Sequence, residues 1–402
     1  MGLGGVSVAS DYPEVSRDEL ERILNSLKKR FQNGDYPNYK ERIDRINRLK
    51  LLVEENSEDF HKALQNDFGT RHEQLSLLSD TLPIIASAKH ISKNLSKWMK
   101  PEKRKPNFPL GLLGAKAFIH NQPYGVVGII SPWNFPLNLS LGPLVEVFAA
   151  GNNAMMKLSE FVPETSDLTE KLVKQYFNDD EVAVINGGPQ TSQSFAGLAF
   201  DHLLFTGSTH IAKKIAYEAS ENLVPLTLEL GGKSPVIVGP KAKMKKSVDK
   251  IMMGKLLNAG QICISPDYVF LPEGKENEFV EHAKSYVQES YETLKNNPDY
   301  TSIIHLNHYE RLRSYISDAK SKGAEIVEIN PANEDLTQQE HHKIPPTLIL
   351  NPTDDMEVMK NEIFGPILPV MSYKNFDETI KYVNHNPKAL ALYYFGDDAK
   401  EV

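Results

Sequence analysis

The spacing of apolar residues changes near position 124 of this 402-residue chain. In the first hundred residues, apolar side chains recur every three or four positions with charged residues between them, which is typical of amphipathic helices. The segment 101–123 then holds four prolines and two glycines, which predicts a bridging stretch. The helices expected before it lie at 16–31, 40–56, 58–66 and 70–100.

From Tyr124 onward, short β-branched or apolar runs alternate with helix-like segments. This alternation predicts βαβ units and a parallel sheet. A nucleotide bound to such a sheet lies at the carboxyl ends of the strands. The strands expected in this first lobe are 126–130, 154–158, 182–185, 203–205 and 226–230.

A second α/β lobe is expected from Glu229 onward. The fold class is therefore α/β, with two parallel-sheet lobes at 1–228 and 229–402. The second lobe is expected to contain helices at 275–290, 309–322 and 377–386, and strands at 235–238, 268–271, 326–328, 347–350, 367–371 and 390–395.

The composition narrows the possible functions. The net charge of −8 argues against nucleic acid as the main partner, because phosphate binding needs a basic face. The densest basic cluster, 241–246, is interpreted as a solvated loop. The most apolar window, 126–150, is interrupted by prolines and polar residues, so we expect no membrane-spanning helix and no membrane anchor. The scattered histidines show no metal-ligand spacing.

The chain contains a single cysteine, Cys263. With one thiol and no evident export signal, a reducing cytoplasm is the expected compartment. Gly260 and Gln261 are expected to leave the backbone uncrowded just before the thiol, and Pro266 breaks any regular element after it. Such an open, polar setting favours a reactive thiolate. The alternative is a packing role, which is common for free cysteines.

A polar loop follows the first expected strand of the sheet. Pro132 and Pro136 restrict this loop, so that Trp133 and Asn134 are held in place. A fixed Asn amide is a good hydrogen-bond donor to negative charge developing on an oxygen. The alternative is that Asn134 caps the helix that follows.

Two further strand ends carry polar residues. Lys157 and Glu160 come directly after a strand, where they could bind the hydroxyls of a ribose, although a surface ion pair is the simpler interpretation. Gly207 and Ser208 stand where a strand turns into a helix, which is an anion site suited to a pyrophosphate. The usual Gly-x-Gly-x-x-Gly fingerprint is absent from every strand end.

Two carboxylates stand beside glycines at other turns. Glu229 precedes two glycines at the boundary between the lobes and is a candidate general base for a thiol or a water. Glu362 and Phe364 lie on a loop that Gly365 and Pro366 restrict.

Four of these motifs together resemble the aldehyde dehydrogenase superfamily, over a span from about residue 40 to the last residue. After Cys263, the sequence Ile-Ser-Pro-Asp-Tyr is most similar to the class 3 branch and its coniferyl-aldehyde-dehydrogenase-like members. The four motifs are Pro-Trp-Asn-Phe-Pro at 132–136, Glu-Leu-Gly-Gly-Lys at 229–233, Asn-Ala-Gly-Gln-Ile-Cys at 258–263 and Glu-Ile-Phe-Gly-Pro at 362–366.

The resemblance implies NAD(P)-dependent oxidation of an aromatic or a fatty, medium-chain aldehyde to the carboxylic acid. Cys263 would attack the carbonyl, Asn134 and the Cys263 backbone N–H would hold the oxyanion, and hydride would pass to the nicotinamide to leave a thioester. Glu229 would then activate the water that releases the acid. Residues assigned to the cofactor by this likeness are Trp133, Lys157, Glu160, Gly207, Ser208, Glu362 and Phe364.

The cofactor expected is NAD, because Glu160 would repel a 2′-phosphate, although class 3 relatives often accept NADP as well. Ala212 stands where the family usually has glycine, so its methyl group is expected either to crowd the pyrophosphate or to be accommodated by the pocket. A homodimer is expected from the family. Because the family's sequences continue beyond Val402, we also expect a C-terminally incomplete catalytic lobe. The alternative function is a non-catalytic remnant that binds dinucleotide without turnover.

Overall fold

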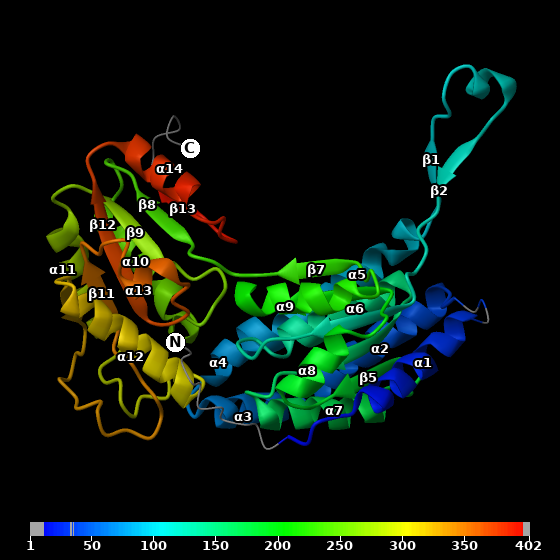
Figure 1. Ribbon diagram of the computed structural model, residues 1–402, viewed down its shortest axis with the longest axis horizontal. Coiled ribbons are helices and arrows are strands. Elements are labelled where there is room, and N and C mark those ends of the chain that lie inside the picture. Colours follow the sequence, from blue (N-terminus) through cyan, green and yellow to red (C-terminus); the bar gives the residue numbers. More distant parts are fainter. Residues whose placement is uncertain (1–11, 33, 35, 397–402) are drawn as a thin grey trace. The chain divides into compact units, whose positions relative to one another are not determined.

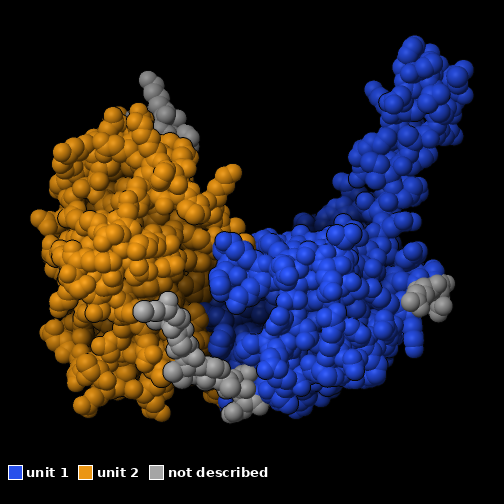
Figure 2. Space-filling view, in the orientation of Figure 1, with its two compact units in different colours: residues 1–63, 76–229 blue, residues 64–75, 230–402 orange. Residues whose placement is uncertain are grey.

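The computed structural model describes residues 12–32, 34 and 36–396 (Figure 1). The chain divides into two compact units, which Figure 2 colours separately. The first contains Met1–Ala63 and Ser76–Glu229, and the second contains Leu64–Leu75 and Leu230–Val402. The short segment 64–75 joins the second unit because Thr70 is held there: its Oγ1 donates to the Tyr300 carbonyl at 3.1 Å, and its own carbonyl accepts from the Ser302 N–H at 3.0 Å.

The first unit begins with amphipathic helices, and local capping residues explain where they start. Asn38, for example, starts α2 with a reciprocal capping box: its side chain accepts from the Lys40 and Glu41 N–H groups, and the Glu41 side chain accepts from the Asn38 N–H. The helices at the start of the chain are α1 (Arg17–Gln32), α2 (Tyr39–Glu55), α3 (Ser57–Phe68), α4 (Glu73–Ser76), a π-helix (Leu77–Thr81) and α5 (Leu82–Trp98).

A five-stranded parallel sheet forms the centre of the first unit, in the order β5-β4-β3-β6-β7. The chain reverses direction across the sheet at β3, which is the strand order of half of a doubly wound nucleotide-binding fold. Its strands are β3 (Val126–Ile130), β4 (Asn153–Lys157), β5 (Val182–Ile185), β6 (His202–Thr206) and β7 (Leu226–Glu229), and its helices are α6 (Asn138–Ala150), α7 (Pro163–Tyr176), α8 (Pro189–Ala196) and α9 (Thr209–Ser220).

The expected bridging stretch contains a hairpin of β1 (Glu102–Arg104) and β2 (Ala117–Ile119), which extends from the rest of the first unit (Figure 1). A 3-10 helix at Leu110–Leu113 lies between the two strands. Phe108, Leu112 and Leu113 in this connection are each about four-fifths exposed or more. The sequence analysis did not predict these short strands, because prolines and charges hide any alternation.

The second unit is built on a six-stranded sheet in the order β10-β11-β12-β9-β8-β13. It is parallel except at one edge, where β10 runs antiparallel to β11. Its elements are β8 (Pro235–Val238), α10 (Met244–Leu256), β9 (Tyr268–Pro272), α11 (Glu276–Ser290), α12 (Leu306–Ser321), β10 (Glu325–Glu328), β11 (Thr347–Leu350), α13 (Glu357–Lys360), β12 (Ile367–Tyr373), α14 (Phe376–His385) and β13 (Tyr393–Phe395).

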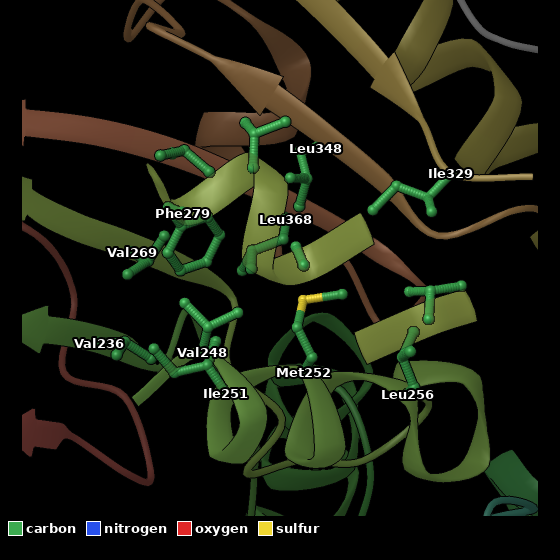
Figure 3. Close-up of a cluster of buried hydrophobic side chains, with 14 of the residues drawn as sticks. Val236, Val248, Ile251, Met252, Leu256, Val269, Phe279, Ile329, Leu348 and Leu368 are labelled. Atoms are coloured by element: carbon green, nitrogen blue, oxygen red, sulfur yellow. The ribbon is translucent and has the colours of Figure 1, made fainter. Parts of the chain in front are cut away.

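The core of this unit joins the sheet to α10 and α11 (Figure 3). Val236 and Val269 from neighbouring strands meet Ile251 of α10 and Phe279 of α11, and all four are fully or almost fully buried. The prediction that residues 241–246 form a solvated loop is wrong in its second half, because α10 starts at Met244. Lys245 and Lys246 lie on the exposed face of this helix, while its apolar positions enter the core.

Every predicted strand is present. The ends of each strand lie within two residues of the prediction, except that the strand expected at 390–395 begins at Tyr393. The prediction of an α/β fold with two sheet-based units is confirmed.

Candidate active site

The sheet register of the first unit brings three of the predicted site loops to one edge. Ile130, the last residue of β3, pairs with Lys157 of β4 on one side and with Phe205 of β6 on the other. Asn134, Glu160 and Gly207 follow these strand ends within four residues. They therefore lie at the carboxyl edge, next to the point where the strand order reverses, which is where such sheets bind nucleotides.

Lys157 is only 1% exposed, so the alternative of a surface ion pair is wrong for this lysine. Its Nζ donates to the Leu158 carbonyl at 2.5 Å and lies 3.4 Å from Oε2 of Glu160. Burial lowers the pKa of Lys157, and the carboxylates of Glu160 and Glu14 oppose that shift. A buried cation at a strand end, with a carboxylate beside it, is suited to binding polar groups of a ligand.

The turn from β6 into α9 is tight. The Gly207 N–H donates to the Glu229 carbonyl at 3.1 Å, and a β-carbon at position 207 would lie 2.6 Å from the Phe205 ring. Ser208 is the N-cap of α9, and its side chain accepts from the Ile211 N–H. The first turn of α9 is exposed, so its N–H groups are accessible to an anion. Ala212 is 2% exposed, so its methyl group packs inside the unit.

Asn134 lies three residues before the N-cap position of the following helix. The N-cap position of α6 is Leu137, and no side chain of the cap residue contributes a hydrogen bond. Instead, Oδ1 of the buried Asp80 accepts from the N–H groups of Leu137 and Asn138 at 3.1 and 3.3 Å. Asn134 is 3% exposed and Trp133 is half-buried. No sequence pattern pointed to Asp80, since its role depends on a contact across 57 positions.

Cys263 occupies a strained turn in the second unit. The three residues Asn258, Ala259 and Gly260 all have positive φ values, of 51°, 50° and 75°. Left-handed backbone at non-glycine residues is costly and is often found at functional sites. Cys263 itself is half-buried, so its thiol is neither a core packing group nor a fully exposed one.

The backbone ahead of Cys263 is crowded, contrary to the expectation for Gly260 and Gln261. A β-carbon at Gly260 would overlap the Gly365 carbonyl, so glycine is required for close approach there. Gln261 is fully buried; its Nε2 donates to the Asn258 and Ser302 carbonyls at 3.0 and 2.9 Å, and its Oε1 accepts from the Ile304 N–H at 3.0 Å. The turn is therefore rigid.

Glu362 and Phe364 lie on the loop before β12. A β-carbon at Gly231 would overlap the Glu362 carboxyl, which therefore lies directly over Gly231. Burial and the Asp267 carboxylate raise the pKa of Glu362 to about 7, although the Gly232 N–H and the charges of Lys233 and Arg311 oppose this. Phe364 is half-buried, with a left-handed φ of 52°.

Glu229 is the last residue of β7 and is exposed in the first unit.

Of the ten predicted site residues, seven belong to the first unit and three to the second, namely Cys263, Glu362 and Phe364. Two charged residues of the second unit were not predicted as site residues, although both lie within the sequence motifs named above. These are Lys233 and Asp267, which form an ion pair in which Asp267 is buried and Lys233 is half-buried.

A third unpredicted residue is Lys255, eight positions before Cys263. It is fully buried, and burial lowers its pKa to about 8, with Asp267 and Glu362 opposing the shift and Lys233 adding to it. No group of His, Cys, Asp or Glu side chains in the described part of the chain could hold a metal ion. Chemically, the first unit gathers polar loops at the carboxyl edge of its sheet, and the second unit contains both a half-buried thiol and a carboxyl of raised pKa.

Known proteins match this arrangement along nearly the whole chain. A model of the aldehyde dehydrogenase family matches residues 6–402. The probable coniferyl aldehyde dehydrogenase of Caulobacter vibrioides is 51% identical over 393 residues, which cover 96% of this chain and 81% of that relative. The coniferyl aldehyde dehydrogenase of Pseudomonas sp. is 44% identical over 401 residues, with 100% and 81% covered.

A solved structure agrees with the sequence matches. The substrate-bound state of Staphylococcus aureus AldH is 34% identical, with a TM-score of 0.89, and the match covers 95% of this chain and 81% of that one. Among the described residues, no helix has both the length and the apolar character needed to cross a membrane. The predicted enzyme class is confirmed: the protein oxidises an aldehyde with a nicotinamide cofactor, NAD or NADP. The chain belongs to the aldehyde dehydrogenase family.

Proposed function

We propose that the enzyme oxidises an aromatic aldehyde of the coniferyl type through a thioester on Cys263, with NAD as the preferred cofactor. The observation that carries the proposal is the turn of Cys263, in which the chain's only thiol stays half-buried while its neighbours are buried and hydrogen-bonded. A rigid turn of this kind presents a nucleophile in one orientation. The coniferyl names of two close relatives support the substrate class.

In the proposed reaction, the Cys263 sulfur bonds to the aldehyde carbon, and the carbonyl electron pair moves to oxygen. The Asn134 amide and the Cys263 N–H donate hydrogen bonds to that oxyanion, and a donor of this kind contributes about 3–4 kcal/mol in the transition state. A bound nicotinamide would supply the oxidising chemistry, as the acceptor of hydride from this carbon. Glu229 takes a proton from water, whose oxygen attacks the thioester carbon, and the C–S bond breaks to give the acid and the thiol.

The residues of the first unit fit the adenosine and phosphate part of such a cofactor. Lys157 is a buried cation at the carboxyl edge of the sheet, and Glu160 beside it is suited to accepting hydrogen bonds from ribose hydroxyls. Gly207 permits close approach, and the exposed start of α9 offers N–H groups to the pyrophosphate. Trp133, half-buried on the neighbouring loop, completes this group of proposed cofactor residues.

In the second unit, Glu362 and Phe364 would hold the nicotinamide end. Glu362 is a carboxyl fixed over Gly231, and it would accept from a hydroxyl of the nicotinamide ribose. The raised pKa of Glu362, about 7, supports a polar role near neutral pH.

Formation of NADH with a panel of aldehydes tests the proposal. Coniferyl and other aromatic aldehydes should give higher kcat/KM than medium-chain fatty aldehydes, and Cys263→Ser should lose turnover while it still binds NAD. Absence of turnover by the pure, folded protein, with Cys263→Ser indistinguishable, would support the non-catalytic alternative. A preference for fatty aldehydes would overturn only the substrate class.

We propose a homodimer as the assembly. The exposed apolar side chains of the hairpin connection, such as Phe108 and Leu112, support an interaction between copies. Light scattering after size exclusion should give twice the chain mass of 45.2 kDa, and a mass of one chain would contradict the proposal.

The cytoplasm is the proposed compartment, because a reducing environment keeps the single thiol of Cys263 available as a nucleophile. Fractionation of the source cells should place the activity in the cytoplasm, and its recovery elsewhere would contradict this.

A further inference from the structure

Lys233 and Asp267 lie at the amino ends of two neighbouring parallel strands. The register pairs Pro235 of β8 with Tyr268 of β9, so the residues just before these strands are also adjacent. The Asp267 N–H donates to the Ser234 carbonyl at 2.8 Å, and Nζ of Lys233 contacts Oδ1 of Asp267. The Asp267 side chain is 4% exposed and that of Lys233 is 17% exposed. The ion pair therefore joins the Gly231–Gly232 segment to the chain that leaves the Cys263 turn.

Both members of the pair also bind the loop of Glu362. Nζ of Lys233 donates to the Val358 and Asn361 carbonyls at 2.7 and 3.0 Å. Oδ2 of Asp267 accepts from the Ile363 N–H at 2.9 Å. The backbone is thus tied on each side of Glu362.

The Glu362 side chain completes this arrangement from the opposite direction. Its carboxyl lies over Gly231 and accepts from the Gly232 N–H. The charged groups that act on it are Asp267, Lys233 and Arg311, and the buried Lys255 is close enough to respond to its charge. The position and the proton affinity of Glu362 therefore depend on the same two residues.

We propose that Lys233 and Asp267 are positioning residues, which together fix the loop of Glu362 to the Gly231–Gly232 segment and to the strand that follows the Cys263 turn. The role of the pair in cofactor binding rests on the proposed function of Glu362. Its mechanical role does not, because the contacts belong to the protein alone. Removal of one partner should loosen these contacts, because the other charge would be left largely buried and uncompensated.

Hydrogen exchange of the intact enzyme without cofactor tests the mechanical role. Lys233→Met and Asp267→Asn should speed amide exchange in residues 357–364 by about tenfold or more, because local opening is set by the contacts that close it. Lys233→Arg keeps a cation that donates to carbonyls and should restore most of the protection. Asp249→Asn, which removes an exposed ion pair of α10, is the matched control and should leave this segment unchanged.

The pKa of Glu362 gives a second test, because a general loss of packing would not shift it in opposite directions in the two variants. Asp267→Asn removes an anion and should lower the pKa of Glu362, whereas Lys233→Met removes a cation and should raise it. Carbon-13 spectra of glutamate-labelled protein across pH, assigned with Glu362→Gln, measure both shifts. Shifts of the two variants in the same direction would overturn the proposal, as would unchanged exchange in folded Lys233→Met and Asp267→Asn.

Failure of the positioning role is distinguishable from failure of the proposed function. If exchange rises but KM for NAD does not, the positioning role stands and Glu362 is not a cofactor ligand. If Lys233→Met does not fold, Asp267→Asn carries both tests, with faster exchange and a lowered pKa of Glu362, and Lys233→Arg is the control that should keep both near their natural values.

Discussion

Arg45 and Glu181, 136 positions apart, form an ion pair in which Nε of the arginine lies 2.9 Å from Oε1 of the glutamate and both side chains are almost fully buried. Arg48 adds two further hydrogen bonds to the same carboxylate, at 2.8 and 2.9 Å. The pair joins α2 to the residue before β5 and so holds this helix at the edge of the five-stranded sheet.

Glu181→Gln should therefore destabilise the enzyme by about 3–5 kcal/mol, because Arg45 would be left buried without a counter-charge. Urea unfolding measures the loss. Glu21→Gln removes the half-exposed Arg17–Glu21 pair and serves as the control, with an expected loss of about 0.3–0.5 kcal/mol. Equal losses in the two variants would contradict the importance of burial.

The same carboxylate should make stability depend on acid. Burial would raise the pKa of Glu181, but hydrogen bonds from Arg48 and the Asn178 N–H, with the charge of Arg45, lower it to about 2. Because the folded pKa lies below the ordinary value of 4.5, the stabilisation is present above about pH 4.5 and is lost as the pH falls toward about 2. Unfolding free energies of the natural enzyme and Glu181→Gln should therefore converge on acidification, and a constant difference would contradict this assignment.

Glu160→Gln should shift the cofactor preference toward NADP. If Glu160 accepts from the 2′-hydroxyl of the adenosine ribose, its charge repels a 2′-phosphate, and removal of that charge should raise the NADP-to-NAD ratio of kcat/KM about tenfold. Glu170→Gln on the outer part of α7 should leave the ratio unchanged. An unchanged ratio in Glu160→Gln would remove this residue from the cofactor site.

Cofactor affinity should weaken as the pH falls through about 7. Burial and the Asp267 carboxylate raise the pKa of Glu362 to about that value, so a ribose contact that needs the carboxylate is lost on protonation. The KM for NAD should rise below about pH 7 in the natural enzyme and stay flat in Glu362→Gln. For folding the sign is opposite. Because the folded pKa of Glu362 lies above the ordinary value of 4.5, its contribution to stability is fully present below about pH 4.5 and is lost as the pH rises through about 7.

Tyr393 should matter more for turnover than its neighbour does. Its hydroxyl donates to the Ile264 carbonyl at 2.6 Å, one residue after the thiol, and its pKa is raised by burial and by Cys263. Tyr393→Phe removes about 1 kcal/mol of hydrogen bonding and should lower kcat about fivefold. Tyr394→Phe, on the opposite face of β13 against Phe376, should not. Alkylation of the single thiol would show whether Cys263 reactivity changes in parallel, and equal kcat values in the two variants would contradict this role.

Local pattern was enough for the strands and for most helices, because β-branched runs and three- to four-residue spacing express preferences of a few neighbouring residues. It was misleading at Met244, where a dense group of lysines hid the apolar positions of α10. It was also insufficient for the hairpin of β1 and β2, whose pairing joins residues up to 17 positions apart, such as Glu102 and Ile119.

The sequence by itself determined the family and the list of candidate residues, since both depend on short motifs in a fixed order. Only the tertiary structure decided how those residues are held. It buries Lys157, crowds Gly260 against Gly365, gives α6 its cap from Asp80, and ties Glu362 to Lys233 and Asp267. These are contacts between distant segments, and burial changes their energies by removing water, so no local pattern along the chain records them.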